Sequence, residues 1–127
     1  MLAVDDDADA RDLVVFLLED CGASVTAVAS AGDALKVLTQ SVPDVLLSDI
    51  GMPDTDGYML LRQVRALPPE QGGLVPAIAL TAYAGEIDYQ QALAAGFQRH
   101  ISKPLEPDKL LETMLDLLVE RSGKNIF

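Results

Sequence analysis

Polar and charged side chains follow four short apolar stretches of the sequence, at the points where buried strands would end. Asp5 and Asp6 come after residues 2–4, Asp49 after 45–47, Thr81 after 77–80 and Lys103 after 100–102. The carboxyl ends of the strands in an open parallel sheet border one crevice. We therefore expect these five side chains to converge on one small pocket.

Such a pocket would combine three carboxylates, one hydroxyl and one ammonium group. Carboxylates so close together repel one another unless a cation joins them. Acidic oxygen ligands suit a hard divalent ion such as Mg2+. A carboxylate beside Mg2+ and an ammonium group is suited to accept a phosphoryl group, so the pattern predicts phosphoryl chemistry.

The elements that must position these residues alternate between short apolar runs and helical patterns, five times over. This order is typical of an α/β fold with a doubly wound parallel sheet, covered by helices on both faces. The predicted strands span residues 2–4, 24–28, 45–47, 77–80 and 98–101; the predicted helices span about 8–21, 31–40, 58–67 and 87–95, and a fifth begins at Pro107.

The helix ends are marked by capping residues. Asp7 is suited to cap the first helix, and Gly22 is a good stop signal after it. Ser30 can cap the second helix, with Asp33 three residues later in a position like that of a capping box. Gly57, before the third helix, is expected to supply a backbone conformation that a side chain would forbid.

Apolar residues at helical spacing predict which sides of the first and last helices face the core. The two stripes are Ala10, Leu13, Val14, Leu17, Leu18 and Cys21, and Leu110, Leu111, Met114, Leu115 and Leu118. Cys21 is the only cysteine, so no intrachain disulfide or thiolate metal site can form. Its place on the stripe predicts a buried thiol.

Length and charge exclude several classes of protein. The 127 residues fit one domain. The net charge is -11 and only nine residues are Lys or Arg, which argues against nucleic-acid binding. No apolar run approaches the length of a membrane span, and the start has no signal-like pattern. We expect a soluble, cytoplasmic domain without direct membrane contact.

Four motifs together closely resemble the receiver domain of bacterial two-component response regulators. They are Asp5-Asp6-Asp7, the stretch from Asp49 to Gly57, Leu80-Thr81-Ala82, and Ser102-Lys103-Pro104-Leu105. The resemblance covers nearly the whole chain, with a receiver domain over residues 1–120 and a tail over 121–127. It implies a flavodoxin-like, five-stranded sheet in the order 2-1-3-4-5 with five helices.

The resemblance also implies a role for each residue of the pocket. Asp49 would accept a phosphoryl group from a phosphohistidine donor, in a Mg2+-dependent reaction that changes the conformation of the domain. Asp5, Asp6, Asp49 and the carbonyl of Gly51 would hold the Mg2+. Lys103 and Thr81 would contact the phosphoryl group. The domain would catalyse its own phosphorylation and dephosphorylation, without a separate turnover substrate.

Three further positions bear on switching and on phosphate lifetime. The family couples movement of the residue at Thr81 to a Tyr or Phe at the position of His100, so this chain departs from the common pattern there. By the same resemblance, Gly51 and Tyr83 occupy positions that in the family flank the path of attacking water and tune the phosphate lifetime. The bond between Lys103 and Pro104 is a candidate cis peptide, as in the family.

The residues around Asp49 and Lys103 look most like receivers at the C-terminus of hybrid sensor histidine kinases. A free-standing regulator is the alternative, although the short first strand favours an excised segment. The partner would be a histidine kinase or a histidine phosphotransfer domain, docked on the first helix and the loop after Lys103, including Ala8, Arg11, Pro104 and Leu105. Phosphorylation could also drive a homodimer through the fourth and fifth helices.

Two other functions compete with this interpretation. A phosphatase resembling the haloacid dehalogenase superfamily would also use an aspartyl phosphate, Mg2+, a Thr and a Lys, but it leaves Asp49 and the residues after it unexplained. A receiver that binds without being phosphorylated should have lost an acidic residue or the Lys, and none is lost.

Overall fold

The computed structural model describes residues 1–52, 55–81, 86–103 and 105–123. In chain order its elements are β1 (Leu2–Val4), α1 (Ala8–Asp20), β2 (Thr26–Val28), α2 (Ala31–Gln40), β3 (Leu46–Asp49), α3 (Gly57–Arg65), the short 3-10 helix η1 (Pro69–Gln71), β4 (Ala77–Thr81), α4 (Glu86–Ala95), β5 (Arg99–Ser102) and α5 (Pro107–Gly123).

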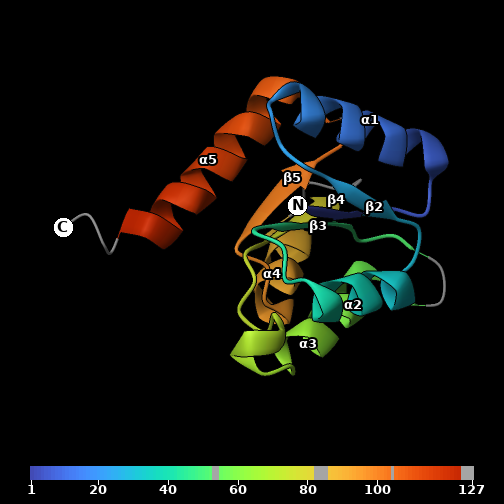
Figure 1. Cartoon of the computed structure of the whole chain (residues 1–127), viewed down its shortest axis with the longest axis vertical. Helices are drawn as coiled ribbons and strands as arrows, with labels where there is room; N and C mark the ends of the chain where they lie inside the picture. The colour runs from blue at the N-terminus through green and yellow to red at the C-terminus, as the bar shows by residue number, and fades with distance from the viewer. Residues whose placement is uncertain (53–54, 82–85, 104, 124–127) are drawn as a thin grey trace.

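The five strands form one parallel sheet in the order β2-β1-β3-β4-β5 (Figure 1). This confirms the doubly wound, flavodoxin-like arrangement. The order brings the ends of β1, β3, β4 and β5 to one edge: Val4 is level with Ser48, Asp49 with Leu80, and Thr81 with Ser102. The sheet therefore provides the crevice that the site requires.

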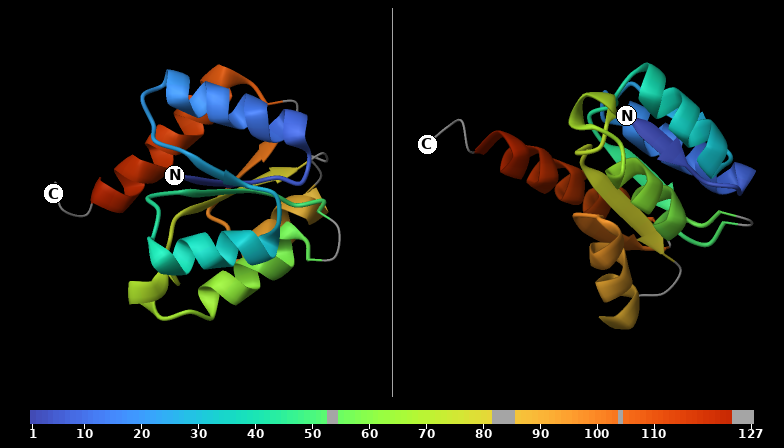
Figure 2. Two further views of the ribbon diagram at one scale, coloured as in Figure 1. Left: turned by 45° about the vertical axis from the view of Figure 1, so that its right-hand side comes forward. Right: turned by 90° about the horizontal axis from the view of Figure 1, so that it is seen from below.

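Two separate cores lie on the two faces of the sheet. Helices α2, α3 and α4 cover one face, and α1 and α5 cover the other (Figure 2). The first core contains buried side chains of α2, α3 and α4, and the second contains those of α1 and α5. β4 contributes to both, because alternate residues of a strand point to opposite faces. Ala77 and Ala79 face the first core, whereas Ile78 and Leu80 face the second.

The predicted caps of α1 and α2 are present. The Asp7 side chain accepts a hydrogen bond from the Asp9 amide at 3.0 Å, and Ser30 Oγ accepts one from the Asp33 amide at 3.2 Å. Each pairs a backbone donor that the first helical turn leaves unsatisfied. The local signals therefore set the start of both helices correctly.

Cys21 is exposed, so the prediction of a buried thiol was wrong. The cause is the end of α1 at Asp20, one residue earlier than the stripe implied. The chain then turns at Gly22, whose φ of 89° is favourable only for glycine. Position 21 therefore no longer continues the buried side of the helix.

The apolar stripes of α1 and α5 are narrower than predicted. Val14 and Leu18 of α1 are buried, while Leu13 is exposed. In α5 the residues i, i+4 and i+7 are buried (Leu110, Met114 and Leu117), and Leu111 and Leu115 are exposed. One helix presents only part of its circumference to the sheet, so a wide stripe leaves apolar side chains outside the core.

The remaining differences are at the ends of elements. β2, an edge strand, begins at Thr26 instead of Ser24, and α5 continues to Gly123. None of the helices in the described part of the chain has the length and apolar character needed to cross a membrane.

Candidate functional site

Two aspartates lie buried at the carboxyl edge of the sheet. Asp5 directly follows β1 and is 2% exposed, and Asp49 is the last residue of the neighbouring strand β3 and is 6% exposed. Asp6 is exposed beside them. Carboxylate oxygens of Asp5, Asp6 and Asp49 lie within 4.8 Å of one another, which confirms that the acidic residues converge.

Lys103 reaches this acidic group from the end of β5. Its Nζ lies 3.1 Å from Asp49 Oδ1 and 3.3 Å from Asp5 Oδ2. The backbone fixes its origin, because the Lys103 amide donates a 2.7 Å hydrogen bond to the carbonyl of Thr81. Thr81 itself is buried at the end of β4. The structure thus brings together the residues that the four strand ends were predicted to supply.

The charges of the pocket are unbalanced. Burial raises the pKa of Asp49 above its ordinary value, a hydrogen bond from Lys103 works against this, and the Asp5 carboxylate adds to the rise. Burial alone would lower the pKa of Lys103, but Asp49 and Asp5 together outweigh it and raise that pKa. The pocket therefore contains one ammonium group and three carboxylates. Its excess of negative charge can be balanced by a bound cation.

The donor set fits Mg2+. Asp5, Asp6 and Asp49 offer only oxygen ligands, which a hard cation prefers, and their spacing allows one ion to contact all three. Gly51, on the loop after β3, is exposed, and apart from its chain neighbours no atom of the described residues lies within 4 Å of the place where a Cβ would be.

Backbone and guanidinium contacts hold Asp5 in place. Its Oδ1 accepts a hydrogen bond from the Asp7 amide at 3.0 Å, and its carbonyl accepts one from Arg11 Nη1 at 2.9 Å. Arg11 thus has a positioning role that its sequence context did not reveal. The only sequence signal for this role was the position of Arg11, one turn into the helix that follows the strand.

The loop after Asp49 packs tightly on itself. The amide of Gly57 donates to the carbonyl of Ile50 at 3.0 Å, and a Cβ at Gly57 would lie 2.5 Å from the carbonyl oxygen of Asp49. Gly57 is not among the glycines with positive φ, so its expected special conformation was wrong. Glycine is required there by close approach. Asp56 caps α3 through the Met59 amide at 2.9 Å.

His100 lies on the same face of the sheet as Thr81. The register pairs Ala79 with His100 and Thr81 with Ser102, which makes His100 a diagonal neighbour of Thr81. Its ring lies 5.7 Å from that of Tyr89 in α4, and its buried Nε2 has no hydrogen-bond partner among the described residues. His100 is thus half-buried in the sheet.

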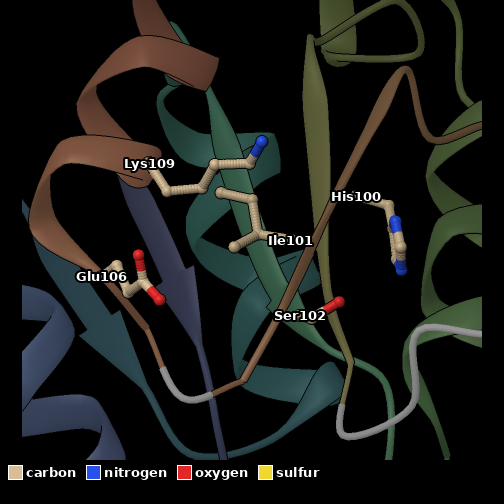
Figure 3. A pocket seen from close by; sticks show the side chains of 5 residues that line it. All are labelled: His100, Ile101, Ser102, Glu106 and Lys109. Atoms are coloured by element: carbon tan, nitrogen blue, oxygen red, sulfur yellow. The ribbon is translucent and has the colours of Figure 1, made fainter.

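A cavity of about 440 Å3 borders β5 and α5, and Asp5, Asp6 and Asp49 are not among its described lining residues. It is lined by His100, Ile101, Ser102, Glu106 and Lys109. Figure 3 shows the His100 ring on the opposite side of β5 from Ile101, Glu106 and Lys109. The acid cluster and Lys103 are therefore not among the residues that line the largest of the cavities described.

Of the predicted partner residues, the structure describes Ala8, Arg11 and Leu105. Ala8 is exposed at the start of α1, and Arg11 and Leu105 are partly exposed. A smaller, apolar cavity of about 150 Å3 is lined by Asp5, Ala10, Leu13, Val14, Leu80, Lys103 and Leu105. Tyr83 and Pro104, with the peptide bond between Lys103 and Pro104, lie outside the described residues.

Comparison with known proteins agrees with this geometry. A family model, the response regulator receiver domain, matches residues 1–115. The "14.6 kDa protein in sodA1 3'region" of Leptolyngbya boryana is 50% identical over 111 residues, which are 87% of this chain and 83% of that protein. The transcriptional regulatory protein CssR of Bacillus subtilis is 35% identical over 115 residues. These residues are 91% of this chain but only about half (49%) of that relative.

A solved receiver domain shares the fold. The receiver domain of sensor histidine kinase PA1611 from Pseudomonas aeruginosa, which has a magnesium ion coordinated in its active site cleft, superimposes with a TM-score of 0.82 at 32% identity, covering 91% of this chain and 93% of that one. In this chain the acidic pocket of Asp5, Asp6 and Asp49 suits Mg2+-dependent phosphorylation. The family match decides against the phosphatase interpretation. The chain belongs to the response regulator receiver domain family.

Proposed function

We propose that Asp49 is the residue that accepts the phosphoryl group. The observation that carries this proposal is the contact of 3.1 Å between Asp49 Oδ1 and Lys103 Nζ, beside two further carboxylates. A bond forms between an oxygen of Asp49 and phosphorus, and the bond from phosphorus to the donor's histidine nitrogen breaks. The electron pair of that bond stays with the nitrogen, and because the other ring nitrogen of the donor carries a proton, the histidine leaves as neutral imidazole.

The other residues stabilise the charge on the group being transferred. The Lys103 ammonium neutralises a phosphoryl oxygen, and the Thr81 hydroxyl donates a hydrogen bond to another. Asp5, Asp6, Asp49 and the carbonyl of Gly51 would hold Mg2+. When bound, the ion supplies positive charge to the phosphoryl oxygens and keeps the carboxylates from repelling one another. Positioning and charge neutralisation are most of what this reaction needs.

His100 is proposed to respond to phosphorylation through Thr81. Support comes from their diagonal placement on one face and from the unpartnered Nε2, which can gain a partner when its surroundings move. The test is the NMR spectrum of the His100 ring with and without beryllofluoride and Mg2+. A change is expected, and unchanged shifts would remove His100 from the mechanism.

The phosphoryl donor of a receiver is a histidine kinase. Finer details are proposals: a histidine phosphotransfer domain as a second kind of donor, docking that includes Ala8, Arg11, Pro104 and Leu105, and a homodimer on phosphorylation. The exposure of Ala8 and the apolar cavity beside Leu105 support the docking site. Transfer from the donor that is unaffected by Ala8→Asp and Leu105→Asp would contradict it.

The parent protein has two candidate architectures, with the receiver over residues 1–120 and a tail over 121–127 in both. The likeness to a receiver from a sensor histidine kinase supports a hybrid kinase. The relative at 50% identity, whose name gives a mass of 14.6 kDa, supports a short, free-standing protein. An immunoblot of source cells with an antibody to this domain separates them, by a band of about the mass of the chain or a much larger one.

The decisive experiment is intact mass spectrometry after incubation with acetyl phosphate and Mg2+. We expect a gain of one phosphoryl group, which a chelator and Asp49→Asn each abolish. Asp44→Asn, outside the pocket, is the matched control and should leave the gain intact. An unmodified mass for the unaltered protein would support a receiver that is not phosphorylated and would overturn the proposal.

A further inference from the structure

Ser48 is a buried polar residue that directly follows a buried apolar run, residues 45–47. It is 0% exposed and is level with Val4 of β1 and Ala79 of β4, which both belong to the core beneath α2, α3 and α4. Paired residues of neighbouring strands point to the same face of a sheet, so the Ser48 side chain faces this core. Burying a hydroxyl there is unfavourable unless it has a hydrogen-bond partner, and that partner indicates the role of the residue.

The partner of Ser48 is the main chain of Asp49. Ser48 Oγ donates a hydrogen bond of 2.9 Å to the carbonyl of Asp49, the residue proposed to accept the phosphoryl group. A Cβ at Gly57 would lie 2.5 Å from the same oxygen, so this carbonyl lies against the start of α3. Gly57 therefore leaves space for the carbonyl oxygen, and Ser48 supplies a donor to it.

The hydrogen-bond ladder between β1 and β3 ends before it reaches this carbonyl. At the start of the ladder, the Leu2 amide donates to the Val45 carbonyl at 3.0 Å. The bonds of a parallel ladder are evenly spaced, so a ladder continued in steps of two residues would bring the Asp6 amide to the Asp49 carbonyl. That bond is not among the backbone hydrogen bonds of these two residues, both of which the structure describes. The Asp49 carbonyl therefore lacks its regular donor from β1.

The missing bond reflects the point at which Asp6 leaves the sheet. The Asp5 amide still donates to the Val28 carbonyl of β2 at 3.1 Å, and the chain then turns toward Asp7, which caps α1. In a continued β1, residue 6 would point to the face opposite that of Asp5. Because Asp6 leaves the ladder, its carboxylate lies beside those of Asp5 and Asp49 instead. The acidic cluster therefore forms at the cost of the donor to the Asp49 carbonyl.

We propose that Ser48 is a positioning residue of the phosphorylation site, whose hydroxyl replaces the donor that Asp6 does not give to Asp49. The Ile50 amide donates to a carbonyl of β4 at 3.1 Å, so the peptide group between Asp49 and Ile50 is held at both its N–H and its C=O. That peptide group begins at the Asp49 main chain and sets the course of the loop to Gly51. The inference rests on the role proposed for Asp49.

Loss of the Ser48 hydroxyl should disturb the acidic cluster without removing any of its carboxylates. The Asp49 carbonyl would either remain unpaired beside the core, which is unfavourable, or take the Asp6 amide as its donor. The second arrangement draws Asp6 back toward the sheet and its carboxylate away from Asp49. Both arrangements release the peptide group after Asp49, so we expect weaker Mg2+ binding and slower phosphorylation.

The test compares Ser48→Ala with Ser48→Thr, which keeps a hydroxyl group. Val45→Ala, directly before β3, is the matched control, since Val45 is also 0% exposed and its side chain is not bonded to the Asp49 carbonyl. Isothermal titration gives the affinity for Mg2+ alone, and intact mass gives the rate of phosphorylation by acetyl phosphate. Urea denaturation gives the stability, and the 13C NMR shift of the Asp49 carbonyl in the metal-free protein reports its hydrogen bond.

We expect Ser48→Ala to lower both the Mg2+ affinity and the phosphorylation rate about tenfold, as loss of a group that orients metal ligands does elsewhere. The Asp49 carbonyl signal should shift, because its hydrogen bond from the hydroxyl is lost. Ser48→Thr should restore all three quantities. Val45→Ala should destabilise the protein and leave the affinity, the rate and the carbonyl signal unchanged.

Three results would overturn the proposal. The first is a Ser48→Ala protein with unchanged Mg2+ affinity and phosphorylation rate. The second is an equal loss in Val45→Ala, since general destabilisation would then explain both variants. The third is a Ser48→Thr protein whose carbonyl signal is restored while its Mg2+ affinity stays low. Absence of phosphorylation in the unaltered protein would instead refute the role of Asp49, and the Mg2+ affinity and carbonyl signal would still test Ser48.

Discussion

Two partly buried cationic side chains, Arg65 and Lys103, have different kinds of hydrogen-bond partners. Arg65 in α3 makes four hydrogen bonds, to the carbonyls of Gly96 and Gly73 and to the side chain of Gln98, at 2.8 to 3.1 Å. Lys103 has two carboxylate partners, and a third carboxylate, Asp6, lies beside them. Neutral acceptors complete the Arg65 cluster, whereas the Lys103 cluster keeps excess negative charge.

The difference separates a structural cluster from a functional one. The guanidinium of Arg65 joins α3, the end of α4 and the loop before β4. Its acceptors are neutral, so they need no further cation. The pocket of Lys103 gains stability only when positive charge arrives. We therefore interpret the Arg65 cluster, whose neutral acceptors are paired with its donor, as structural. We interpret the Lys103 cluster, whose carboxylates outnumber its ammonium group, as a ligand-binding site.

The largest effect is expected from Lys103→Met. Loss of the ammonium should slow phosphorylation by acetyl phosphate about 10²- to 10³-fold, as removal of one charge-stabilising donor does in other enzymes. Affinity for Mg2+ should rise, because a repelling cation is gone. Stopped-flow phosphorylation and a Mg2+ titration measure the two effects. Lys109→Met, on exposed α5, is the control, and equal losses in both variants would contradict the assignment.

Arg65→Met should destabilise the fold without affecting the site. It leaves the carbonyls of Gly96 and Gly73 without their donor, so we expect the free energy of unfolding to fall by about 2–4 kcal/mol. Urea denaturation measures this, and affinity for Mg2+ should stay the same. Arg62→Met, exposed on the same helix, should change stability by less than about 0.5 kcal/mol. A changed Mg2+ affinity in the Arg65 variant would break the distinction between the clusters.

Gly57→Ala is expected to affect both stability and reactivity. The new Cβ would lie 2.5 Å from the Asp49 carbonyl oxygen, so β3 or the start of α3 must move. We expect a loss of about 1–3 kcal/mol in urea denaturation, as for other overpacked positions, together with slower phosphorylation. Gly32→Ala, where no atom lies within 4 Å of the new Cβ, is the control. Unchanged phosphorylation in a destabilised Gly57 variant would mean that the loop does not position Asp49.

The smallest effect concerns Mg2+ and pH. At a concentration ten times its Kd, Mg2+ should stabilise the protein by about 1.4 kcal/mol, and this gain should be smaller in Asp49→Asn. Thermal unfolding with and without a chelator measures it. Equal stabilisation of both proteins would place the ion elsewhere.

The sign of the pH effect follows from the raised pKa of Asp49. Because the folded protein holds that proton more tightly than the unfolded chain, the ionised carboxylate destabilises the metal-free fold above its folded pKa. That penalty is relieved as the pH falls through the folded pKa toward the unfolded value. Metal-free Asp49→Asn should therefore have its largest stability advantage near neutral pH and lose it in acid. An advantage that grows in acid would contradict the charge imbalance.

Much of the fold could be predicted because the signals are local. The caps at Asp7 and Ser30, and the apolar runs before Asp5, Asp49, Thr81 and Lys103, are contained in a few neighbouring residues each. Those signals were enough for the strand ends and for the convergence of the site. The failures at Leu111 and Leu115 have one cause, since helical spacing gives an apolar side but not how much of it a sheet will cover. The prediction for Cys21 failed because α1 ends one residue before it.

The sequence by itself determined which groups are present and at which strand ends they stand: three carboxylates, a hydroxyl and an ammonium, in a chain with a net charge of -11. Only the tertiary structure decided which of them touch, that Arg11 and Gly57 support them, and which leucines remain outside the core. Contacts such as that of Lys103 with Asp49 join residues 54 positions apart. Their distances depend on the packing of the whole sheet, which no local pattern specifies.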